Sequence, residues 1–84
     1  MRKRAEWMTP FDDQILEVLH SSQLVLSPSI IAFNLERSRE GVSKRLSELT
    51  SHGLVEKIER GKYEISGKGE AYLAGDLDAS ELNE

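Results

Sequence analysis

The segment SREGVSKRLSEL, residues 38–49, decides how the whole chain is interpreted. Its apolar residues Val42, Leu46 and Leu49 recur at positions i, i+4 and i+7. This spacing places them in one stripe, about 100° wide, along an α-helix. The other positions in the segment hold polar, charged or small residues. The segment therefore predicts a helix that packs along one side and leaves the other side open to a partner.

The ends and the open side of this helix can be assigned from residue type. Ser38 can accept a hydrogen bond from an amide of the first turn, and Gly53 suits the left-handed residue that follows a helix. We therefore expect the helix to cover residues 38–52, with Arg39 at its exposed start. The side chains that face away from the apolar stripe are Glu40, Ser43, Lys44 and Ser47.

Length and composition limit the class of protein. The 84 residues suffice for one domain, and 38% apolar with 31% charged residues is typical of a folded domain. The absence of cysteine excludes disulfides and thiolate metal ligands. No apolar run approaches the roughly 20 residues that span a bilayer, and no apolar signal segment follows the basic start. We expect a cytoplasmic protein without a membrane partner.

The net charge of −4 at first argues against a nucleic-acid ligand, because phosphate neutralisation requires Lys and Arg. The charges, however, are distributed unevenly. Residues 37–62 carry seven basic and four acidic side chains, whereas residues 5–36 and 63–84 each have a net charge of −5. The middle of the chain is therefore locally basic. A DNA-binding surface and an ordinary solvated surface both remain open at this point.

Two further helices are expected before the helix described above. Thr9 and Ser27 are N-cap residues, and each precedes a proline, which is favoured at the first helical position. These signals predict helices over about residues 10–20 and 28–34. Between them, Leu24-Val25-Leu26 has the length and apolarity of a short strand.

The pattern changes after the third helix, since residues 54–59 and 62–65 are rich in strand-forming side chains. Gly61 between them can supply the positive φ of a tight turn. A last helix is expected over residues 68–74. The order predicts an α+β, mostly α, winged helix-turn-helix with a three-helix core, a short strand, a two-stranded wing over 54–65 and a C-terminal helix.

The same elements set the expected domain boundaries. The winged-helix domain is predicted to cover residues 7–75. Residues 1–6 are predicted to form a basic N-terminal arm. Residues 76–84 contain four acidic and no basic side chains, so we expect an acidic, disordered tail.

Several segments together resemble one known family. They are Ser27-Pro28, Ile31-Ala32, Ser38-Arg39, Val42-Ser43-Lys44-Arg45-Leu46, Leu49, Gly53-Leu54-Val55-Glu56 and Gly61-Lys62-Tyr63, flanked by Trp7-Met8-Thr9, Asp12-Asp13, Ile15-Leu16-Glu17, Tyr72-Leu73-Ala74-Gly75 and Leu77-Asp78-Ala79. Over roughly residues 7–79 the chain resembles winged-helix proteins of halophilic archaea that are similar to a halophage repressor. The resemblance implies a small DNA-binding transcriptional regulator that acts as a repressor, is often dimeric and has double-stranded DNA as its partner. Gly41 and Glu40 make this helix less basic than a strong phosphate binder.

Four side chains on the helix over 38–52 are candidates for contacts with base edges. Arg39 and Lys44 can donate to guanine, and Ser43 and Ser47 can pair with several bases. A solvated helix face is the alternative. Glu40 could accept from cytosine, but its position one turn before Lys44 favours a local ion pair.

A second group of residues is expected to contact the DNA backbone rather than the bases. Arg60 and Lys62 flank the tip of the wing, where they can reach a phosphate or a minor groove. Protection of an edge strand by charge is the alternative. The full set of backbone candidates is Ser38, Arg45, Lys57, Arg60 and Lys62.

A third group could join two subunits. Its members are large side chains around Trp7 in the N-terminal segment and around Tyr72 in and after the last helix: Trp7, Met8, Tyr72, Leu73 and Leu77. Packing within their own small core is an equally good interpretation. A winged-helix module that docks on a protein partner through Phe33, Trp7 and Tyr72, without binding DNA, is the alternative function.

An enzyme is not expected. His20 and His52 lack a cysteine or carboxylate at metal-ligand spacing, and histidines near helix ends commonly interact with the helix dipole. Gly67-Lys68-Gly69 lacks the upstream glycine spacing and the following Ser or Thr of a phosphate loop. The sequence therefore indicates no catalytic residues, no metal, no cofactor and no small-molecule ligand.

Overall fold

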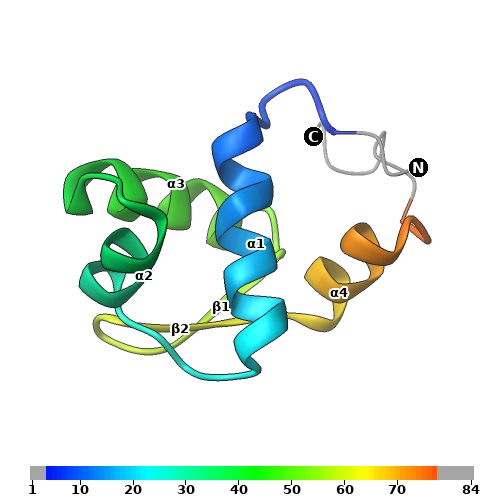
Figure 1. Cartoon of the computed structure of the whole chain (residues 1–84). Coiled ribbons are helices and arrows are strands. Elements are labelled where there is room, and N and C mark those ends of the chain that lie inside the picture. Colours follow the sequence, from blue (N-terminus) through cyan, green and yellow to red (C-terminus); the bar gives the residue numbers. More distant parts are fainter. Residues whose placement is uncertain (1–3, 78–84) are drawn as a thin grey trace.

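The computed structural model describes residues 4–77 and contains four helices and one two-stranded sheet in that range. Figure 1 shows α1 in the centre, with α2 and α3 on one side and α4 on the other. The hairpin runs beneath the helices. The elements are α1 (Pro10–Ser22), α2 (Pro28–Leu35), α3 (Arg39–Ser51), β1 (Val55–Glu59), β2 (Lys62–Ile65) and α4 (Gly67–Ala74).

The core lies where α1 meets the other helices. On α3 the predicted stripe is confirmed, because its three apolar residues are fully buried. On α1 the buried apolar residues are Ile15, Leu16 and Leu19, whereas Val18 is only partly buried. The buried apolar residues are Ala5, Met8, Ile15, Leu16, Leu19, Ile31, Ala32, Val42, Leu46, Leu49, Leu54, Val55 and Tyr72.

Serine caps begin three of the helices, two of them at residues that the sequence predicts. Ser27, Ser38 and Ser66 each accept a hydrogen bond from the amide three residues ahead, at 3.3, 3.1 and 3.0 Å. The C-terminus of α3 is also as predicted, since Gly53 has a φ of +80°. The first helix is longer than predicted and ends at Ser22, after which Gln23 adopts the left-handed conformation.

The predicted strand at 24–26 is reduced to a single bridge. Leu26 and Tyr63 exchange two backbone hydrogen bonds, of 2.8 and 2.9 Å. Leu24 and Val25 are exposed and pair with no strand. The sequence overestimated this element because an apolar run of three residues cannot distinguish a strand from a loop that touches one.

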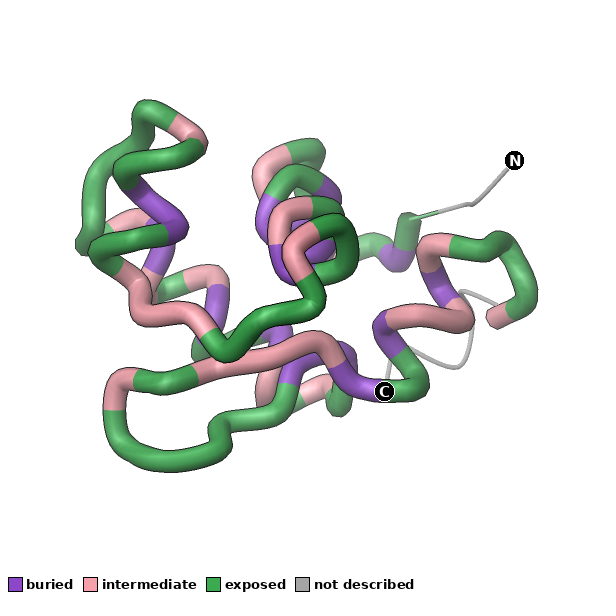
Figure 2. The backbone as a smooth tube through the Cα atoms, turned by 60° about the horizontal axis from the view of Figure 1, so that its bottom comes forward, coloured by how far each residue is buried: buried purple, intermediate pink, exposed green. Residues whose placement is uncertain are grey.

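The hairpin forms as predicted. Its strands are antiparallel, with Val55 opposite Ile65, and the register is irregular between Lys57 and Glu59. Gly61 makes the turn with a φ of +77°. Figure 2 shows that the far end of the hairpin is exposed. The helices, the single bridge and this wing give the winged helix-turn-helix architecture that the sequence predicts.

The residues just before α1 contact the domain. Ala5 is only 3% exposed, and Arg4 Nε donates to Asp13 Oδ2 at 2.7 Å. Part of the predicted basic arm over residues 1–6 is therefore packed against the fold. The predicted acidic tail lies mostly outside the described residues, which end at Leu77.

Candidate nucleic-acid interface

The predicted base-contact residues lie next to one another on the open side of α3. Arg39, Ser43 and Ser47 are spaced four residues apart, so they form one row along the helix. Lys44 lies beside this row. Arg39, Lys44 and Ser47 are exposed, and Ser43 is partly buried. The buried stripe of the same helix holds this side outward, toward solvent.

The ion pair predicted between Glu40 and Lys44 is not formed. Five other ion pairs occur between residues 4 and 77, but none of them joins these two side chains. Both are exposed on the helix surface, where water solvates each charge and little is gained by holding two long side chains together. The Lys44 ammonium therefore remains available to a ligand.

Gly41 is explained by close packing at the start of α3. A Cβ atom at this position would lie 3.0 Å from Ser38 Oγ and 3.5 Å from the Phe11 ring. The first contact is with the cap that begins the helix. The absence of a side chain therefore lets the cap and α1 approach the first turn closely.

Arg45 is held inside the protein. Its Nε and Nη2 donate to the two carboxylate oxygens of Asp12, each at 2.8 Å, and Nη2 also donates to the Trp7 carbonyl oxygen at 3.2 Å. The hydrogen bond with Asp12 raises the pKa of Arg45 above its usual value. This guanidinium joins α3 to α1, so the geometry does not support the predicted contact between Arg45 and a phosphate.

The C-terminal end of α3 has a second anchor. Trp7 stacks on His52, with ring centroids 3.9 Å apart and planes inclined by 11°. Trp7 thus connects the segment before α1 to Arg45 of α3 and to His52 at its C-terminal end, which are about two helical turns apart. Together with Asp12, these contacts fix the direction in which the open side of α3 points.

Two predicted subunit-contact residues are used within the chain instead. Tyr72 is 1% exposed, and its hydroxyl donates to Asp13 Oδ1 at 2.7 Å. Met8 is also buried in the core. Neither side chain has surface left for a second subunit, so the interpretation as core packing applies to both. Leu73 and Leu77 are only partly buried.

The wing presents basic side chains near α3. Arg60 is exposed at the tip, and Lys62 Nζ lies 3.4 Å from Glu59 Oε1 in an exposed pair. Lys57 is exposed on β1 and faces a cleft next to α3. This cleft is lined by Ser47, Thr50, Ser51, Lys57 and Tyr63. Thr50 and Ser51 were not predicted as site residues, although Ser51 continues the four-residue spacing of the row.

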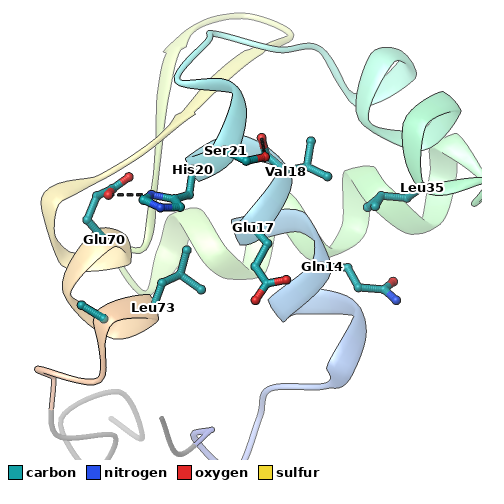
Figure 3. A pocket seen from close by; sticks show the side chains of 9 residues that line it. Gln14, Glu17, Val18, His20, Ser21, Leu35, Glu70 and Leu73 are labelled. Carbon is teal, nitrogen blue, oxygen red and sulfur yellow. Dashed lines mark hydrogen bonds and ion pairs between the residues drawn. The ribbon is translucent and has the colours of Figure 1, made fainter. Parts of the chain in front are cut away.

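A larger groove lies on another side of the molecule, between α1 and α4. Figure 3 shows Val18, Leu35 and Leu73 along it, and His20 pointing toward Glu70 at one end. His20 Nδ1 and Glu70 Oε2 are 2.8 Å apart. The groove has a volume of about 630 Å³.

No cluster of three or more metal-binding side chains occurs in the described part of the chain. None of the helices between residues 4 and 77 combines the length and apolarity that a bilayer-spanning segment requires.

Comparison with known proteins agrees with this geometry. The profile described as winged helix-turn-helix phage repressor matches residues 1–84. The repressor protein of Halobacterium phage phiH is 38% identical over 98% of this chain and 97% of that protein. The crystal structure of the PhiH1 repressor-like protein from Haloarcula marismortui is 39% identical, with a TM-score of 0.83 over 94% of this chain and 91% of that one. One of these relatives is named as a repressor and the other as a repressor-like protein, and neither is named as an enzyme. The chain belongs to the winged helix-turn-helix phage repressor family.

Proposed function

We propose that this chain is a sequence-specific DNA-binding regulator of transcription that acts as a repressor. In this proposal α3 enters the major groove, and the wing lies on the backbone or in the adjacent minor groove. The proposal rests on the row of hydrogen-bonding side chains on the open side of α3, whose other side is packed into the core. Membership of the family supports a DNA-binding regulator in general.

Different residues have different roles in the proposed complex. Arg39, Ser43 and Lys44 face the base edges, because they occupy the open side of α3. The backbone contacts come from the cap residue of α3 and from the wing, through Ser38, Lys57, Arg60 and Lys62. Arg45 has a positioning role through Asp12. Ser47 lines the cleft beside the wing and is considered in the next subsection.

We further propose that the regulator is a homodimer. A single helix of this length contacts few base pairs, and two-fold symmetry doubles the contact. The surface that remains for such a contact includes Leu73 and Leu77, since Tyr72 and Met8 are buried within the chain. Leu73 also lies along the groove between α1 and α4, which offers an apolar surface to a second copy.

Selection from genomic DNA tests the proposed function. Immobilised protein is incubated with sheared genomic fragments, and the recovered fragments are titrated by fluorescence anisotropy at several salt concentrations. We expect a preferred fragment and an affinity that falls as salt rises. The proposal is overturned if no fragment is enriched and if no duplex binds even at low salt.

A protein-docking module is the alternative, and Phe33 is the observation that favours it. This ring is 82% exposed on α2, next to the half-exposed Ile30. However, the other two anchors proposed for docking are engaged, because Trp7 stacks on His52 and Tyr72 is buried. A Phe33→Asp variant should bind DNA like the wild type if the DNA-binding proposal holds and Phe33 is only a surface residue.

A further inference from the structure

We propose that the cleft between α3 and the wing binds one DNA phosphate through hydroxyl groups and a single cation. The residues assigned to it are Ser47 and Thr50 of α3 and Lys57 of β1. The cleft has a volume of about 270 Å³ and is lined by residues of α3 and of both strands of the wing. This inference rests on the proposed function, because it specifies how that DNA would be held.

The chemistry of the walls suits an anion. Three of the five lining residues are Ser or Thr, one is Lys and none is acidic. Lys57 forms no ion pair with any residue between 4 and 77, so its charge is not neutralised within the described structure. Neutral hydroxyls and an ammonium group are both common donors to DNA phosphates. No carboxylate in the wall would repel one.

Thr50 provides an independent observation. Its Oγ1 is the single buried side-chain polar atom without a hydrogen-bond partner in the described part of the chain. Leaving a buried hydroxyl unpaired is unfavourable, so an unpaired one calls for an explanation. The atom itself is covered, but Thr50 lines the cleft. In the proposed complex the side chain turns about χ1 to present its hydroxyl, since helical threonines occupy two rotamers. A bound phosphate would then give Thr50 its missing acceptor.

The two serines of the cleft differ. Ser51 Oγ donates to the Glu48 carbonyl oxygen at 2.9 Å, so its proton is already used within the helix. Ser47 is exposed and has no such hydrogen bond to another described residue. We therefore assign the donor to Ser47, which places this residue on a phosphate rather than on a base edge.

The cleft holds two hydroxyl donors and one cation, and these two kinds of group respond differently to salt. DNA releases counterions in proportion to the cationic charge that a protein places on its phosphates, and hydroxyls place none. Affinity contributed by Ser47 and Thr50 should therefore persist as salt rises. Lys57, by contrast, should contribute to the slope of log K against log salt concentration. Such a cleft would let a chain of net charge −4 bind DNA with few phosphate-contacting cations.

The test compares hydroxyl and charge variants on two probes. The probes are a fluorescein-labelled duplex of about two helical turns, selected by the wild-type protein from a random pool, and a scrambled duplex of the same length. The variants are Ser47→Ala, Thr50→Val, Thr50→Ser and Lys57→Gln. Ser29→Ala and Lys68→Gln are matched controls, since both side chains are exposed and lie outside the cleft. Thermal unfolding checks the folding of each variant.

We expect Ser47→Ala and Thr50→Val to weaken binding to both probes by roughly 3- to 10-fold at every salt concentration, with an unchanged slope. Thr50→Ser should bind like the wild type, because it keeps the hydroxyl. Lys57→Gln should reduce the slope by about 0.9 per bound subunit. The two control variants should match the wild type in both affinity and slope.

Two results would overturn the inference while leaving the proposed function intact. In the first, the wild type binds DNA and the Ser47→Ala and Thr50→Val variants bind it as tightly as the wild type does. The other is a loss confined to the selected duplex, which would make Ser47 a base reader. Because Ser47 is exposed, its alanine variant decides the question even if Thr50→Val unfolds. If the wild type binds neither probe, the proposed function itself fails.

Discussion

Arg45 of α3 and Asp12 of α1 form a two-point ion pair, with both hydrogen bonds at 2.8 Å, although 33 residues separate them in sequence. The Asp12 side chain is fully buried, and the Arg45 side chain is 18% exposed. Asp12 Oδ2 also accepts from the backbone amide of Thr9 at 2.8 Å. One carboxylate therefore caps α1 and sets the orientation of α3 against it.

Replacing Asp12 should destabilise the fold strongly. Asp12→Ala leaves the Arg45 guanidinium without its partner in a largely buried place, which should cost about 3 to 5 kcal/mol. Thermal unfolding followed by circular dichroism measures this. As a control, Glu59→Ala removes an exposed ion pair and should change stability by less than about 1 kcal/mol. Equal melting temperatures for the two variants would show that the buried pair does not fix α3.

Two glycines of α4 should respond oppositely to alanine. At Gly69 a Cβ atom would lie 2.7 Å from Ile65 Cγ1 and would also clash with the Leu54 carbonyl oxygen, so Gly69→Ala should cost about 1 to 3 kcal/mol. At Gly67 a Cβ atom would meet nothing within 4 Å, and Gly67→Ala should be neutral or stabilise by up to about 1 kcal/mol. Urea unfolding of both variants checks this. A Gly69→Ala variant as stable as Gly67→Ala would contradict the close approach of α4 to Leu54 and to Ile65 of β2.

Leu46 is the central residue of the buried stripe on α3 and is fully buried. Leu46→Ala should therefore cost about 2 to 5 kcal/mol, through lost burial and the cavity that remains. In a chain of this size each kcal/mol lowers the melting temperature by about 4 to 8 °C. Leu24→Ala is the matched control, because Leu24 is exposed and its truncation should change stability by less than about 0.5 kcal/mol. A Leu46 variant that melts with the wild type would place the wrong side of α3 in the core.

Local features of the fold could be predicted because they depend on neighbours in sequence. Examples are the cap at Ser38, the turn at Gly61 and the buried stripe on α3. Each depends only on residues a few positions away in the sequence. Asp12 and Asp13 could be predicted only as charges near a helix N-terminus. Their burial depends on partners 33 and 59 residues away, which no local pattern reveals.

The candidate site divides in the same way. The row from Arg39 to Ser47 was predictable from helical periodicity. The cleft with Lys57 was not, because it depends on how the wing folds back beside α3. Arg45 shows the limit most clearly, since its charge suggested a phosphate contact whereas its position places it against Asp12.

Self-association should be detectable by sedimentation velocity. We expect twice the mass of the chain at high micromolar concentration, because two-fold symmetry is the usual way for a regulator this small to extend its DNA contact. Leu73→Asp should shift the protein toward the monomer, since it places a charge on the proposed contact surface. Phe33→Asp serves as the control at a distant exposed site. A wild-type monomer that still binds DNA would exclude the dimer as a requirement.

The last prediction separates base contacts on α3 from phosphate contacts at the wing tip. Lys44 lies on the open side of α3, so Lys44→Ala should weaken binding to the preferred duplex by about 1 to 3 kcal/mol and relax the preference at one base pair. Replacing Arg60 or Lys62 should weaken binding to all duplexes alike and reduce the salt slope by about one per subunit. Competition titrations with single-base variants of the duplex measure the base preference, and titrations at several salt concentrations measure the slope.

The two signatures differ because base edges vary between sequences while phosphates do not. Lys62 should give the smaller change of the two wing residues, because its ammonium already lies 3.4 Å from the Glu59 carboxylate in the free protein. Arg60 has no ion pair with the described residues and should carry most of the wing's contribution. If substitutions at Lys44 and Arg60 both leave affinity, base preference and salt dependence unchanged, DNA is not bound by this face, and docking on a protein through Phe33 becomes the better proposal.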